Sequence, residues 1–295
     1  MEAWVGFTLF AAAMQTARTA GQKAIVQSLG AVTVTAVRYL FALPFVLLYL
    51  FFVAGDTALQ TLTSAMSWSF AVYLLLAGIA QIVATLMLVK LLDHRNFAIA
   101  TVLSKTEALQ AAVFGAVFLG ALLSWQAWTA VVLGSIGVIV LSLQSKVNAI
   151  DVKSAGLGLL CGAGFALTAL WIREASLSLN FSYLLNAALS LAFMTFIQSV
   201  LCLLIVMSRN SNGFQDMRAE FVKCVFVGAT SAAGSVGWFT ALALANAALV
   251  RTLGQIEIVF AVLLTYLLFG EKISTREWLG LALLIGGIVL ILWSL

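Results

Sequence analysis

The chain repeats itself at a spacing of 150 residues, and this repeat limits the possible folds more than any other feature. Without a gap, Asn96 aligns with Asn246 and Glu107 aligns with Glu257. The same register pairs Ala98 with Ala248, Leu103 with Leu253, Gly120 with Gly270, Ser124 with Ser274, Trp128 with Trp278 and Gly137 with Gly287. Because one register holds across a glutamate in an apolar stretch and across distant glycines, we infer a duplication. The two domains are predicted at residues 1–150 and 151–295.

The composition places both repeats in a membrane. Of the 295 residues, 63% are hydrophobic and 9% are charged, whereas soluble domains carry about 25% charged residues. A chain with so few charges cannot cover itself with a solvated surface. The net charge of +4 comes from Lys and Arg in predicted loops and forms no basic patch suited to nucleic acid, so we expect no nucleic-acid partner.

Ten apolar stretches have the length of about 20 residues that crosses roughly 30 Å of hydrocarbon. They are residues 3–26, 32–53, 67–92, 97–118, 125–144, 155–177, 182–207, 220–244, 247–269 and 276–294. Several connections are very short, so consecutive helices are expected to be antiparallel neighbours. The sequence therefore predicts an all-α polytopic membrane protein of ten transmembrane helices, five in each repeat.

An odd number of helices per repeat has a consequence for function. The second repeat must enter the membrane in the opposite orientation, which gives two inverted five-helix repeats. Inverted repeats are characteristic of secondary transporters, which place their substrate near the bilayer midplane between the repeats. The expected partners are a small-molecule substrate and membrane lipid, with a monomer and a homodimer both open.

Basic residues predict the orientation. The loops after the third, fifth, seventh and ninth spans carry Lys or Arg, among them Arg95, Lys146, Arg209 and Lys272. Residues 54–66 and 119–124, on the opposite side, carry none. The positive-inside rule then predicts a multi-pass protein of the cell (inner) membrane with both termini non-cytoplasmic. The N-terminus lacks the basic start of a secretory signal, so the first span is expected to remain.

Two glutamates lie where the bilayer makes charge most costly. Glu107 and Glu257 are about ten residues into their spans, or roughly 15 Å at 1.5 Å per residue, and intramembrane charges are candidates for function. Gln255 and Lys105 stand two positions before them. The glutamates could bind a substrate ammonium or take up a proton. Alternatively, they could form ion pairs that lock helices together, with Lys105 neutralising Glu257 across the pseudo-twofold axis.

Further candidates lie in the first, sixth and eighth spans. Arg18 lies deep in the first span, with Gln15 nearly one turn before it, and could contact a carboxylate or another anion. Trp238, beside small residues, and Trp171 could line an apolar pocket, although an aromatic within a span is more often packing. Other tryptophans near span ends, including Trp4, are predicted to form an interfacial belt. The predicted substrate-binding residues are Glu257, Gln255, Trp238, Glu107, Lys105, Arg18, Gln15 and Trp171.

Catalytic and metal motifs are missing from the sequence. It has no GxxxxGK[ST], GxSxG or HExxH pattern, and His94 is its only histidine. The three cysteines stand singly in apolar runs without metal-ligand spacing. We therefore expect no enzyme activity, no catalytic residues, no metal and no cofactor.

A hairpin in the second repeat resembles a known family. Leu268-Phe269-Gly270-Glu271-Lys272 is followed by Trp278, Gly280 and Gly286-Gly287, and Arg38-Tyr39-Leu40 opens an apolar run in the second span. These motifs are similar to those of the EamA-type permeases of the drug/metabolite transporter superfamily. Many members carry Glu-Pro where this chain has Glu257-Ile258, and Ala108 stands at the equivalent position of the first repeat. It is therefore open whether the fourth and ninth helices keep the family's kink.

The resemblance implies a function. It implies a secondary carrier for a small polar metabolite, often an amino acid or related compound and often exported, which works by alternating access as two helix groups rock around a central cavity. Three alternatives are open. They are a proton-coupled organic cation or drug exporter, a flippase for a lipid-linked substrate, and a non-transporting membrane scaffold. The scaffold predicts that both glutamates are paired and sealed from water.

Overall fold

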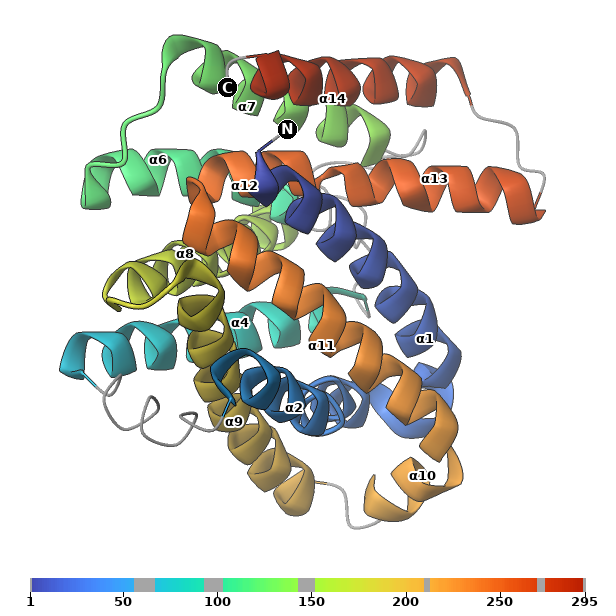
Figure 1. Ribbon diagram of the computed structural model, residues 1–295. Helices are drawn as coiled ribbons and strands as arrows, with labels where there is room; N and C mark the ends of the chain where they lie inside the picture. Colours follow the sequence, from blue (N-terminus) through green and yellow to red (C-terminus); the bar gives the residue numbers. More distant parts are fainter. Residues whose placement is uncertain are drawn as a thin grey trace. The chain divides into compact units, whose positions relative to one another are not determined.

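The computed structural model describes residues 2–55, 67–92, 103–142, 152–209, 213–269 and 274–293, in which every regular element is an α-helix (Figure 1). The helices are α1 (Ala3–Leu40), α2 (Leu43–Ala54), α4 (Trp68–Leu92), α6 (Glu107–Leu119), α7 (Trp125–Ser142), α8 (Val152–Leu177), α9 (Tyr183–Arg209), α10 (Gly213–Ala219), α11 (Phe221–Leu244), α12 (Ala247–Gly254), α13 (Ile256–Phe269) and α14 (Thr275–Trp293). Each of the ten predicted spans coincides, over its described part, with one or two of these helices. The predicted all-α membrane fold is confirmed.

Within the described residues, seven helical segments are long and apolar enough to cross a membrane. The number is smaller than ten for three reasons. The segment Ala3–Ala54 covers the first two spans, and α6 begins only at Glu107 and counts as a shorter apolar helix. The ninth span is divided into α12 and α13, so neither part reaches spanning length by itself.

The chain forms two compact units, and each takes helices from both sequence repeats. The first unit contains Met1–Ile79 and Trp171–Leu244, and the second contains Ala80–Leu170 and Ala245–Leu295. The units therefore do not follow the repeats. The predicted domain division at residue 150 concerns the repeats and stays a prediction.

In the first unit, α1 is bent and packs closely on α11. The bend is at Gly30, whose φ of 74° and ψ of 159° interrupt the helix between the first and second predicted spans, and glycine adopts positive φ without steric cost. Helices α1 and α11 lie side by side (Figure 1). A Cβ added to Gly237 would lie 2.7 Å from the Phe7 carbonyl oxygen, so the absence of a side chain allows this approach.

In the second unit, α7 and α14 form a tight pair built on glycines (Figure 1). A Cβ on Gly137 would lie 2.5 Å from the Leu284 nitrogen, and one on Gly287 would lie 2.8 Å from the Gly134 nitrogen. Small residues allow such close backbone approach between membrane helices. Gly137 and Gly287 are equivalent positions of the two repeats, so each repeat contributes a glycine at the same position to the contact between α7 and α14.

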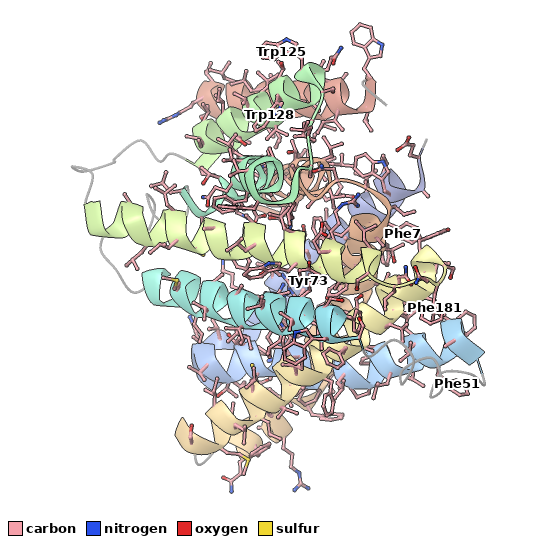
Figure 2. All side chains as sticks on the ribbon, turned by 90° about the vertical axis from the view of Figure 1, so that its left-hand side faces the viewer. Phe7, Phe51, Tyr73, Trp125, Trp128 and Phe181 are labelled. Atoms are coloured by element: carbon pink, nitrogen blue, oxygen red, sulfur yellow. The ribbon has the colours of Figure 1, made fainter. Side chains whose placement is uncertain are left out.

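The tryptophans predicted for the interfacial belt differ in exposure, and Trp128 is half-buried. Trp68, Trp125, Trp278 and Trp293 are exposed near helix ends, as predicted. Trp125 and Trp128 both lie on α7 (Figure 2). The prediction for Trp4 is wrong, because its side chain is only 3% exposed and its indole N–H donates to Glu2 Oε2 over 2.6 Å. Its proximity to the N-terminus suggested an interfacial position, whereas its side chain is buried.

Candidate functional site

The ninth predicted span is interrupted two residues before Glu257. Helix α12 ends at Gly254 and α13 begins at Ile256, with Gln255 between them. The Gln255 backbone N–H donates to the Thr252 carbonyl over 3.2 Å, and the Ile258 N–H donates to the Gln255 carbonyl over 3.0 Å. Both bonds span three residues, which is the tighter 3₁₀ pattern. The break is therefore a local tightening of the helix.

The first repeat carries the same break. Lys105 and Thr106 form a turn before α6, and the Thr106 N–H donates to the Leu103 carbonyl over 3.2 Å. The Thr106 hydroxyl donates to the same carbonyl over 2.6 Å. Residues 108 and 258 are Ala and Ile, so both breaks form hydrogen-bonded turns without a proline at these positions. The sequence left this point open.

The two breaks bring Lys105 and Glu257 together in the second unit. Lys105 Nζ lies 2.7 Å from Glu257 Oε1, which is a direct ion pair. The side chains are 33% and 17% exposed, respectively, so both are partly buried. This contact is one of the interpretations that the sequence left open for the glutamates.

A second ion pair also joins the two repeats, but here the second repeat supplies the cation and the first repeat supplies the carboxylate. Arg251 Nη1 lies 3.8 Å from Glu107 Oε1, so each repeat supplies the cation for the other's glutamate. Lys105 also interacts electrostatically with Glu107 and Arg251. We call Lys105, Glu107, Arg251 and Glu257 the four-charge cluster. Arg251 was missed among the predicted site residues, although a cation inside an apolar span was a signal for it.

Both glutamates lie at the N-terminal ends of helices. Glu107 is the first residue of α6 and Glu257 is the second residue of α13. The N-terminal end of a helix carries a partial positive charge that stabilises a carboxylate. The breaks thus do two things: they bring the cluster together and they place each carboxylate at a favourable helix end.

Gln255 completes this site. Its Nε2 donates to the Lys105 carbonyl over 3.3 Å. Its Oε1 is buried and accepts no hydrogen bond from the residues that the structure describes. A buried acceptor without a donor is uncommon in folded proteins. This oxygen is therefore suited to accept a hydrogen bond from a bound ligand.

The remaining predicted residues belong to the first unit. Trp238 on α11 is buried, and its indole N–H donates to Gln15 Oε1 on α1 over 3.1 Å. Arg18, one turn after Gln15, is also buried, and Trp171 on α8 is half-buried. The eight predicted residues thus separate into Lys105, Glu107, Gln255 and Glu257 in one unit and Gln15, Arg18, Trp171 and Trp238 in the other.

Metal chemistry has no support in the described part of the chain. Within it, no group of three or more His, Cys, Asp and Glu side chains could hold a metal ion. The four-charge cluster contains two carboxylates, but each already faces a cation from the chain. Its chemistry is the recognition of opposite charges.

A known family matches the sequence twice, over residues 2–143 and 152–293. It is described as the EamA-like transporter family. The chain belongs to this family. The two matches cover both repeats and confirm the two-repeat polytopic membrane fold and the resemblance to the drug/metabolite transporters. The protein is therefore a multi-pass membrane protein of a transporter family.

A solved structure supports the same fold. It is titled "Crystal structure of protein", is 13% identical in sequence, and superposes with a TM-score of 0.77. The match covers 99% of this chain and 96% of that chain. At this identity the likeness shows the fold alone. Among curated proteins, none matches the sequence.

Proposed function

We propose that the protein is a secondary transporter that exports a small zwitterionic metabolite, an amino acid or a related compound, by alternating access. The observation that carries the proposal is the Lys105–Glu257 ion pair at two interrupted helices. Interrupted helices form the substrate sites of many secondary transporters. The export direction rests on the family resemblance.

The charges of the pair favour a zwitterion. A substrate ammonium can replace Lys105 at Glu257, and a substrate carboxylate can replace Glu257 at Lys105. The exchange leaves the net charge of the site unchanged, so no charge is left without a partner in a low-dielectric environment. Gln255 Oε1 would accept one further N–H of the ammonium, which gives that oxygen its missing donor.

A cation exporter fits the pair less well. An organic cation that took Glu257 would leave the Lys105 ammonium without a counter-charge, which is costly inside a membrane.

The scaffold alternative predicts that both glutamates are paired, and each of them faces a cation. It also predicts sealed pairs, whereas the Lys105 side chain is 33% exposed. A lipid-linked ligand is an outcome that the experiment below distinguishes.

The test is a thermal-shift screen of the purified protein against amino acids, quaternary amines, nucleobases, sugars and lipids. A ligand at 100 times its dissociation constant stabilises by about 2.7 kcal/mol. We expect stabilisation by amino acids that is lost in Glu257→Gln. The matched control is Glu220→Gln, which breaks the more exposed Lys223–Glu220 pair and should keep the shift. Stabilisation by quaternary amines alone, or by lipid alone, would refute the proposal.

A further inference from the structure

The four-charge cluster is electrically neutral without any ligand. Lys105 and Arg251 contribute two positive charges, and Glu107 and Glu257 contribute two negative charges. No other charged residue lies on α6, α12 or α13, and α7 has none. The charged residues of α14 are Arg276 and Glu277 in its first turn, where Glu277 bonds to Ser274.

This neutrality bears on whether substrate transport must be coupled to the movement of a proton or another ion. During alternating access, the site passes through states that are closed to water on both sides. A carboxylate without a counter-charge is strongly disfavoured in such a state. A carrier with an uncompensated carboxylate can therefore reorient only after it binds a proton or a cationic substrate. That requirement is the origin of proton coupling at a membrane-embedded acid.

We propose that Lys105 takes the place of the coupling proton, so that this protein is a facilitator that needs neither a proton gradient nor a counter-substrate. The inference rests on the proposed function. Glu257 is neutralised by Lys105 when the site is empty and by the substrate ammonium when it is loaded. Both states are neutral, and both can reorient.

The geometry indicates which pair opens for the substrate. The Lys105 side chain is 33% exposed, whereas that of Arg251 is 10% exposed. Lys105 is therefore the less enclosed of the two cations, and we assign the exchange with the substrate to it. The Arg251–Glu107 pair keeps its own neutrality throughout, and Lys105–Glu257 exchanges partners with the substrate.

The first experiment uses the full-length protein in liposomes loaded with a mixture of radiolabelled neutral amino acids and a trapped pH dye. We expect efflux into buffer without amino acids, no change of lumenal pH, and less than a twofold response to a pH gradient of one unit. Efflux that requires external amino acid, or that moves protons in step, would overturn the inference and leave the proposed function intact. No efflux of any amino acid would refute the proposed function, and this inference with it.

The second experiment removes the Lys105 charge, which should make transport depend on protons. In Lys105→Gln, Glu257 has lost its fixed counter-charge. The empty carrier can then reorient only with a proton on the site. A bound organic cation such as choline can also neutralise the site by itself. We expect amino-acid efflux to fall at least tenfold, and choline-loaded vesicles to acidify as choline leaves. Wild type should show no choline-driven acidification, and neither should the matched Lys105→Arg variant, because both keep the counter-charge of Glu257. Choline efflux from wild type, or a Lys105→Gln protein with wild-type, pH-independent amino-acid efflux, would overturn the inference. The wild-type measurement decides it even if Lys105→Gln does not fold.

Discussion

Gln255 Nε2 donates a hydrogen bond to the backbone carbonyl of Lys105 over 3.3 Å, and these two residues are equivalent positions of the two repeats. A residue that contacts its own counterpart lies where the two repeats meet. The helices are interrupted at this point, so the Lys105 carbonyl can accept a hydrogen bond from a side chain. One glutamate follows two residues later in each repeat. The duplication supplies the two glutamates of the four-charge cluster, whereas Lys105 and Arg251 have Gln255 and Thr101 as their counterparts. Each repeat nevertheless supplies the cation for the glutamate of the other.

Substitutions of Lys105 and Glu257 should have non-additive effects on the free energy of unfolding. Lys105→Met or Glu257→Leu alone leaves one charge without its partner, at a cost of about 1–3 kcal/mol, which is less than for a fully buried pair because both side chains keep some exposure. The double variant should regain most of this loss. Thermal melts in detergent provide the double-mutant cycle. The matched cycle at Lys223 and Glu220, a more exposed pair at the start of α11, should give less than about 0.5 kcal/mol. Additive single effects at Lys105 and Glu257 would show that the pair is not formed.

Gln255→Leu should weaken amino-acid binding more than it weakens the fold. The variant removes the buried Oε1 that we assign to the substrate ammonium, and a hydrogen bond to a charged group contributes about 1.5–3 kcal/mol. We expect an affinity loss of at least tenfold, measured by titration calorimetry. Gln126→Leu, in the exposed first turn of α7, serves as the control and should bind normally. Unchanged affinity in Gln255→Leu would remove Gln255 from the site.

The glycine contact between α7 and α14 should be sensitive to a single methyl group. Gly137→Ala would place Cβ 2.5 Å from the Leu284 backbone nitrogen, so the helices must separate, and overpacking of this kind costs about 1–3 kcal/mol. Gly286→Ala, whose Cβ would lie 3.5 Å from a Leu133 methyl group, is the matched control. We expect a melting temperature several degrees lower for Gly137→Ala only; equal melting temperatures would contradict the packing.

The orientation of the chain is a separate prediction. The distribution of Lys and Arg places both termini on the non-cytoplasmic side. An alkaline phosphatase fused after Leu295 should then be active in cells, and a fluorescent protein that matures only in the cytoplasm should be dark at the same position. The reverse pattern would place the termini inside. Because the Lys105–Glu257 pair is internal, that result would leave the proposed site unchanged.

Patterns that are local in the sequence were sufficient for much of the fold. The apolar stretches predicted the helices because the length of a span is set by the bilayer. The buried glutamates pointed to the site because intramembrane charges are costly and rare. The packing glycines were visible as a repeated pair, Gly137 and Gly287, and the structure places both between α7 and α14.

Features that depend on distant contacts or on weak local preferences were harder to predict. The breaks before Glu107 and Glu257 arise from three-residue hydrogen bonds, which have no strong sequence signature once proline is absent. The Arg251–Glu107 contact joins residues 144 positions apart and depends on how the repeats fold together. Trp4 is buried by neighbours that the local sequence does not reveal.

The central claim is that Lys105 and Glu257 together recognise a zwitterion. Its most direct test is titration calorimetry with the amino acid that stabilises the protein most, with its amide, and with the analogue that lacks the amino group. We predict that only the amino acid binds well, and that each analogue binds at least tenfold more weakly because it leaves one member of the pair without a partner. Equal affinity for the amide, which carries an ammonium but no carboxylate, would contradict the claim.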